Sequence, residues 1–355
     1  MNLTRATTVL LAVALAPATL PAQEARWNEL NGRTQQFVRQ GRYAEAVPVA
    51  QEALRVAEAT FGPNDPRVST SLGNLALVYH NQDKLAQAEP LYRRALEIDE
   101  KTLGPNHPLL AINLNNLAEL YNDQGNYAQA EPFYRRALAI QEKAHGPDHP
   151  DVATPVNNLG TLYFNQGEYA QAEPLYRRAL AIREKTLGPN HTEVASSLNN
   201  LALLYHEQGK YSEAEPLYHR ALAIQEKALG PNHPEVATNL NNLGLLYHDQ
   251  GKYTDAEPLY HRALAIRAKA LGPDHTDVAN TLHNLAGLHR DRGNYAQADP
   301  LYRRALAIHE KALGPDHPSL ATILENYAAL LRKTDREAEA AKLEARAAAI
   351  RAKKR

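Results

Sequence analysis

The sequence contains no cysteine among its 355 residues. It can therefore form no disulfide, no thiolate metal site and no cysteine nucleophile. It also lacks an excess of either charge, because 39 lysine and arginine residues stand against 40 acidic ones. Strong non-specific binding of nucleic acid requires a basic surface, so we expect no nucleic-acid partner.

Long apolar runs are missing after the first 22 residues, and we expect no membrane span in the mature chain. The start of the chain differs: Arg5 precedes an apolar run from Val9 to Ala16, and small residues and prolines follow. This layout is typical of a bacterial secretory signal, with cleavage after Ala18 or Ala22. We expect residues 1–22 to be a signal peptide and the mature chain to be periplasmic or secreted. The alternatives are an uncleaved N-terminal anchor or an ordinary coil segment that only resembles a signal.

A Gly-Pro pair recurs at intervals of 42 residues without any insertion. The pairs lie at 62–63, 104–105, 146–147, 188–189, 230–231, 272–273 and 314–315. A fixed period of this length predicts a solenoid, in which each unit stacks only on its neighbours. No strand pattern occurs, so we expect an all-α fold.

Each 42-residue unit contains two helical patterns. Leu110, Leu117 and Tyr121 lie on one apolar helix face, and Gly125 follows where a left-handed residue would end that helix. A second pattern begins at Tyr127 and ends before the next Gly-Pro pair.

A proline stands early in each second pattern, as Pro132 does. It predicts a loose first turn or a kink, unless the helix starts later than the pattern suggests.

The pattern Leu114-x2-Leu117-Ala118-x2-Tyr121-x8-Ala130-x3-Tyr134-x2-Ala137 resembles the tetratricopeptide repeat signature. The 42-residue period and the Leu-Gly-Pro-Asx-His-Pro connector are similar to the repeats of kinesin light chains. The resemblance implies a right-handed superhelical solenoid of antiparallel helix pairs whose concave groove binds peptide segments of other proteins. We expect an irregular N-terminal helix or cap over 23–40, the array over 41–333, and a charged capping helix over 334–355.

Two asparagine columns repeat on the first helix of each unit. The main column consists of Asn74, Asn116, Asn158, Asn200, Asn242, Asn284 and Asn326, and a second column of Asn115, Asn157, Asn199 and Asn241 precedes it by one residue. Asparagine is a poor helix former, so its recurrence within a helix needs a reason. In related repeats these positions face the groove, which implies a clamp on a peptide backbone. The alternative is that the amides join neighbouring helices.

One turn later the same face varies, and variation within a rigid repeat is where specificity can lie. This variable column consists of His80, Asn122, Phe164, His206, His248, Arg290 and Arg332, beside Asp123, Glu207, Asp249 and Asp291. Arg290, Arg292, Arg332 and Lys333 predict that the C-terminal end of the groove prefers acidic segments.

Catalytic and metal-binding patterns are not found. The connector histidines, such as His149, lie one unit apart and are interpreted as helix caps because they cannot converge on one metal. Repeated copies build a groove rather than one preorganised site, so we expect no enzyme activity and no cofactor. We expect a protein–protein interaction scaffold. The alternative is a structural spacer or self-assembling rod without a peptide ligand.

Overall fold

The computed structural model describes residues 19–353, which form α-helices and no strand. The helices divide into two compact units, one ending at Pro105 and one beginning at Asn106. The first unit contains α1 (Leu20–Arg39), α2 (Tyr43–Phe61), α3 (Pro66–His80) and α4 (Leu85–Leu103). The all-α prediction is confirmed.

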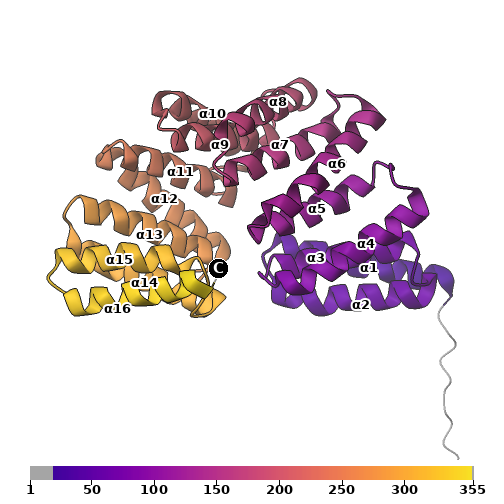
Figure 1. Cartoon of the computed structure of the whole chain (residues 1–355), viewed down its shortest axis with the longest axis horizontal. Coiled ribbons are helices and arrows are strands. Elements are labelled where there is room, and N and C mark those ends of the chain that lie inside the picture. The colour runs from indigo at the N-terminus through magenta and orange to yellow at the C-terminus, as the bar shows by residue number, and fades with distance from the viewer. Residues whose placement is uncertain (1–18, 354–355) are drawn as a thin grey trace, which may run out of the picture. The chain divides into compact units, whose positions relative to one another are not determined.

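The second unit alternates a first helix of 14 to 16 residues with a second helix of 17 to 19 residues. Its helices, seen from magenta to yellow in Figure 1, are α5 (Leu110–Asp123), α6 (Tyr127–His145), α7 (Pro150–Asn165), α8 (Tyr169–Leu187), α9 (Thr192–Glu207), α10 (Tyr211–Leu229), α11 (Pro234–Asp249), α12 (Tyr253–Leu271), α13 (Thr276–Asp291), α14 (Tyr295–Leu313), α15 (Leu320–Lys333) and α16 (Glu337–Lys353).

Apolar side chains join each helix pair to the next. In α7, Val152 and Val156 are fully buried against Ile182 of α8 and against Leu138 of the preceding helix α6. The leucine at this position recurs at 180, 222, 264 and 306, each time against the following first helix. At the C-terminal end the equivalent residue is Ala348, which is exposed, so the last helix has no comparable knob for a further pair.

Close approach of the two helices of a pair depends on a column of small residues. Ala76, Ala118, Ala202, Ala286 and Ala328 are fully buried, and glycine takes this place at 160 and 244. A Cβ atom added at Gly244 would lie 2.9 Å from the ring of Tyr260. A larger side chain at this column would therefore collide with the second helix of the same pair.

The ends of the helices follow the sequence pattern closely. Gly125 has a φ of 75°, the left-handed conformation predicted for a residue that ends a helix. The second helix α6 begins at Tyr127 and continues through Pro132, so the alternative of a later start is wrong. The predicted kink at the proline stays a prediction. The region predicted as irregular, 23–40, lies in the continuous helix α1.

The connector histidines cap the first helices, as the sequence predicts. The Nδ1 atom of His149 accepts the backbone N–H of Asp151 at 3.3 Å, which satisfies a donor at the start of α7. The same bond is made by His107, His191, His233, His275 and His317. In the first unit Asp65 performs this role for Arg67.

The first helices lie on the inner side of the curve within the second unit. Each contacts the first helix of the next pair, from α5 to α15, whereas no second helix of α6–α16 approaches the second helix of the next pair. We call the solvent-facing side of α5, α7, α9, α11, α13 and α15 the first-helix face.

Candidate binding surface

Each first helix exposes one stripe of side chains at intervals of three or four residues. In α9 the stripe consists of Ser196, Asn199 with Asn200, Leu203 and Glu207, all exposed or half-buried. Because the period is 42 residues, α11 presents Thr238, Asn242, Leu245 and Asp249 at the same places, whereas its Asn241 is buried. On α9 and α11 the first-helix face therefore carries parallel rows of hydroxyl, amide, apolar and acidic side chains, and on the other first helices only the main asparagine column continues without a change.

The asparagine columns form a ladder of hydrogen bonds between successive first helices. An amide of the main column donates through Nδ2 to the Oδ1 atom of the second column in the preceding pair. The bonds are Asn200 to Asn157 at 3.0 Å, Asn242 to Asn199 at 3.2 Å, Asn284 to Asn241 at 3.1 Å and, in the first unit, Asn74 to Asn31 at 2.8 Å.

This ladder shows the interhelical bonds that the sequence left as an alternative. Asn115, Asn116, Asn157, Asn158, Asn200 and Asn242 nevertheless remain half-buried rather than fully enclosed. An amide nitrogen that makes one such bond keeps a second N–H, so contact with a ligand stays a prediction.

The ladder is interrupted at Asn115, and one of its members lines a pocket. The Oδ1 atom of Asn115 is buried without a hydrogen-bond partner. In the first unit Asn74 also lines a surface pocket of about 290 Å³, together with Thr34, Val38 and Leu77.

The variable column is more buried than its sequence variation suggests. His206 is only 5% exposed, and its Nε2 atom lies 2.8 Å from an Asp249 carboxylate oxygen on the next first helix. His248 makes the same contact with Asp291 at 3.0 Å. Asn122 accepts a hydrogen bond from Asn165 of α7 at 3.1 Å.

Two further members of the variable column, His80 and Phe164, lie near tyrosine rings. The rings of Phe164 and Tyr169 are 5.6 Å apart, and those of His80 and Tyr92 are 6.3 Å apart. Specificity through this column stays a prediction, and the exposed positions beside it are the acids and the leucines at 203 and 245.

The basic residues near the C-terminal end are paired with carboxylates. Arg290 contacts Asp291 at 2.7 Å, and Arg332 contacts Glu344 at 2.8 Å. Arg292 forms an ion pair with Glu257. An acidic ligand segment would have to compete with these internal carboxylates.

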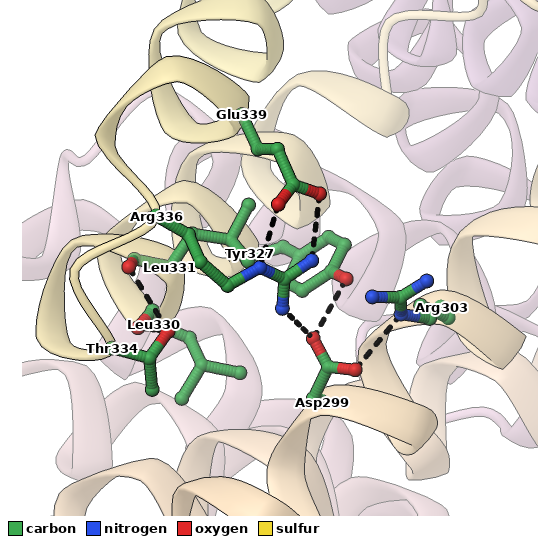
Figure 2. Close-up of polar contacts among 8 residues, drawn as sticks. All are labelled: Asp299, Arg303, Tyr327, Leu330, Leu331, Thr334, Arg336 and Glu339. Carbon is green, nitrogen blue, oxygen red and sulfur yellow. Dashed lines mark hydrogen bonds and ion pairs between the residues drawn. The ribbon is translucent and has the colours of Figure 1, made fainter.

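A second polar contact joins successive pairs and is not evident from the sequence pattern. The Glu/Arg pairs on the second helices have the spacing of a solvated face, but Tyr205 of α9 donates to Glu173 of α8 at 2.8 Å, beside Arg177. Figure 2 shows the C-terminal version, in which Tyr327 donates to Asp299 at 2.9 Å. In the sequence, this contact could be recognised from the spacing of 28 residues between an arginine and a tyrosine, as between Arg177 and Tyr205.

In the contact that Figure 2 shows, Arg336 also binds the Asp299 carboxylate. Its guanidinium donates to Asp299 and to Glu339, both at 2.7 Å, while Arg303 holds the other Asp299 oxygen at 2.8 Å. These donors, led by Arg336, hold the pKa of Asp299 below its usual value despite the partial burial of the carboxyl.

One histidine takes the place of an asparagine in the ladder. His283 occupies the second column in α13, and its Nε2 atom lies 2.8 Å from the Asn326 amide nitrogen. Burial, followed by the charges of His309 and Arg290, lowers the pKa of His283 to about 4. Burial likewise lowers the pKa values of His289 and His309. These three histidines are therefore favoured as neutral rings in the folded chain.

Within residues 19–353, no group of three or more histidine and acidic side chains is arranged to hold a metal ion. In the same part of the chain, no helix combines the length and hydropathy needed to cross a membrane.

The family model that describes the tetratricopeptide repeat matches overlapping segments from residue 35 to residue 353. The chain belongs to the tetratricopeptide repeat family. The resemblance drawn from the sequence is confirmed, and the matched region extends through α16. No curated protein matches the sequence.

Several solved tetratricopeptide repeat structures are similar to this chain. BtubC (BKLC) from P. vanneervenii is 26% identical, with a TM-score of 0.51 over 66% of this chain and 91% of that one. A putative kinesin light chain from Podosopora anserina with nearly identical TPR-like repeats is 29% identical, with a TM-score of 0.49 over 58% and 97%. A Rap protein complexed with Competence and Sporulation Factor is 17% identical, with a TM-score of 0.58 over 95% and 99%.

The amide ladder predicts energetic coupling between successive repeats. Replacing Asn199 or Asn242 with alanine should lower the free energy of unfolding by about 1 kcal/mol each, because each change removes one partner of the same bond. The loss of unfolding free energy in the double variant should be smaller than the sum of the two single losses, by at least about 0.5 kcal/mol. Urea denaturation measures all three, with Ser196→Ala as a control that alters only a bond within its own helix. Strictly additive losses would contradict the ladder.

Acidification should destabilise the C-terminal repeats through His283. Its folded pKa of about 4 lies below its ordinary value of 6.5, so the folded state favours the neutral ring. The contribution of His283 to the free energy of unfolding is fully present above pH 6.5. It falls by about 3 kcal/mol as the pH drops toward 4. Thermal unfolding of His283→Asn, which restores the residue of the other repeats, should depend less on pH over that range. An unchanged pH profile would show that His283 does not contribute.

Proposed function

We propose that this tetratricopeptide repeat protein is a non-catalytic scaffold that binds extended segments of other proteins along its first-helix face. Repeat proteins of this family are generally protein-interaction scaffolds, and a Rap protein of the same fold was solved in complex with Competence and Sporulation Factor. The observation that carries the proposal is the exposed stripe, repeated in register on successive inner helices.

The stripe suits a main chain as well as side chains. Amides such as Asn200 and Asn242 can donate to or accept from a peptide backbone without requiring a particular side chain. Half-buried leucines at 203 and 245 offer apolar contacts between the amide row and the acidic row. The main asparagine column recurs on each first helix instead of converging on one point, which supports binding rather than catalysis.

The structural alternative, a spacer or self-assembling rod, is favoured by one observation. The amide ladder uses the asparagines as links between repeats, which is a sufficient structural reason for their recurrence. Against end-to-end assembly, the exposed face of α16 has alanine at 348 where internal pairs have an inserted leucine.

At the C-terminal end of the first-helix face, we propose that the bound segment is acidic. An acidic segment there would meet Arg290, Arg332 and Lys333 on α13 and α15. The two arginines already contact Asp291 and Glu344, so we expect this end to contribute only weakly to affinity.

Selection from a random peptide library displayed on phage tests the proposed function. Selected peptides should bind the purified chain, and replacing Leu203 and Leu245 with serine should weaken binding at least about tenfold, since two half-buried apolar contacts are lost. Replacing Ala170 and Ser212, exposed on the second helices, with glutamine should change affinity less than about twofold. Failure to select any peptide, together with a mass that rises with concentration in light scattering, would favour the rod.

We propose further that the protein is exported and acts outside the cytoplasm. The support is the leader pattern of residues 1–22; its first cleavage site, after Ala18, lies outside the described residues, and the second, Ala22, lies in the first turn of α1. N-terminal sequencing of the chain recovered from bacterial periplasm should begin at residue 19 or 23. An intact Met1 would contradict export by cleavage.

A further inference from the structure

Charges are segregated between the two helices of each repeat. The first helices α5, α7, α9 and α11 contain no lysine or arginine, whereas their second helices α6, α8, α10 and α12 contain twelve. The same first helices carry seven carboxylates: Glu119, Asp123, Asp151, Glu193, Glu207, Glu235 and Asp249. Glu119, Asp123, Glu207 and Asp249 lie at exposed positions of the stripe, whereas Asp151, Glu193 and Glu235 lie in the first turns of their helices, where Glu193 forms an ion pair with Arg183 at 3.3 Å. The neutral total of the chain therefore conceals an acidic stripe on α5, α9 and α11.

Two of these acids stand where their own helices disfavour them. Glu207 is the last residue of α9 and Asp249 is the last residue of α11. The C-terminal end of a helix carries partial negative charge, so an acid there costs about 0.3–1 kcal/mol where a lysine or arginine would stabilise. Neither carboxylate forms an ion pair with a lysine or arginine within residues 19–353. A cation supplied by a ligand would relieve both the side chain and the helix end.

The polar groups beneath this acidic row are incompletely satisfied. His206 is 95% buried and contacts Asp249 through Nε2, while its Nδ1 atom has no hydrogen-bond partner. The hydroxyls of Tyr218 and Tyr260 are fully buried and also lack partners. Glu207 and Asp249 lie near enough to these tyrosines to contribute, after burial, to raising their pKa values. Buried polar groups without partners are rare, so the interior next to the acidic row holds polar atoms whose bonding is incomplete among the described residues.

Each acid has an apolar neighbour one helical turn earlier. Leu203 precedes Glu207 by four residues and Leu245 precedes Asp249 by four, and both leucines are half-buried. Residues four apart on a helix lie on the same face. Lysine and arginine combine a long aliphatic stem with a charged head, and such a side chain could lay its stem on the leucine while its head reaches the carboxylate.

The spacing of the repeats matches an extended chain. Packed helices lie about 8–10 Å apart, so equivalent acids on α9 and α11 recur at about that distance. A polyproline II chain has three residues per turn and advances about 9 Å per turn, which returns every third side chain to the same face. We propose that the first-helix face of α9 and α11 binds an extended protein segment that carries lysine or arginine at every third residue; α7 has Asn165 in this row and interrupts it on the N-terminal side. This inference rests on the proposed function and names the chemical class of its partner.

The lysines nearest to this acidic row contact groups other than its carboxylates. Lys210 and Lys252, in the turns after α9 and α11, lie 5.5 Å and 5.2 Å from the centres of the Tyr205 and Tyr247 rings. Lys252 also contacts Glu215 of α10 at 3.6 Å.

Fluorescence anisotropy with three synthetic peptides tests the inference. The peptides repeat Lys-Ala-Pro, Gln-Ala-Pro or Glu-Ala-Pro six times, and the protein is the chain from residue 23. The lysine peptide should bind about tenfold more tightly than the glutamine peptide and more tightly still than the glutamate peptide, and added salt should weaken its binding. Equal binding of the three peptides, or binding that is insensitive to salt, would overturn the inference.

Matched variants locate the binding. The double variant Glu207→Gln with Asp249→Asn keeps the shapes of both side chains and an acceptor for His206, and it should weaken the lysine peptide about tenfold. Glu213→Gln with Asp255→Asn removes the same charge from exposed positions of α10 and α12 and should change affinity less than about twofold. Equal losses in both variants would overturn the inference. Circular dichroism confirms that both variants fold.

The proposed function can fail or survive separately. If phage-selected peptides lose binding when Leu203 and Leu245 are replaced but contain no excess of lysine or arginine, the scaffold function stands and the basic partner is wrong. If the lysine peptide binds and depends on Glu207 and Asp249, the inference is supported directly.

Discussion

Burial of an apolar seam between successive helix pairs is the constraint on which the structure depends. A single pair leaves its valines and leucines exposed, and they are covered only when a leucine such as Leu138 of one pair enters the valine cluster around Val152 in the next. This contact must recur, so the chain must repeat, and the period cannot vary without displacing the seam. The exposed Ala348 of α16 shows how the same contact is brought to an end.

Polar contacts fix how one pair sits on the next. The amide ladder joins inner helices, and the tyrosine–carboxylate contacts join each second helix to the following first helix. Hydrogen bonds contribute modestly to stability, but they are directional and so favour one arrangement of the stack over sliding alternatives. The asparagines can therefore serve the architecture and still present their remaining donors to a ligand.

The repeat also places the residues that link neighbouring pairs by ion pairs on the second helices, away from the first-helix face. Basic residues gather on the second helices, where many bind carboxylates and backbone carbonyls of neighbouring pairs, as Arg178 does with Glu142 and Pro147. The inner helices α5, α7, α9 and α11 are left without lysine or arginine, and α9 and α11 combine exposed acids with half-buried leucines. Such a face differs chemically from the rest of the molecule although the whole chain carries almost no net charge.

The sequence by itself determined the helices, their caps and their pairing, because periodicity, glycine, proline and the connector histidines act over a few residues. The roles of His149 and Gly125 follow from the sequence alone, since each acts on backbone next to it. Only the tertiary structure decided where the polar side chains point. Asn242 reaches Asn199, 43 residues away, and Tyr205 reaches Glu173, 32 residues away, because stacking brings distant positions together. Whether a side chain meets a neighbour or solvent depends on that stacking, which no local pattern specifies.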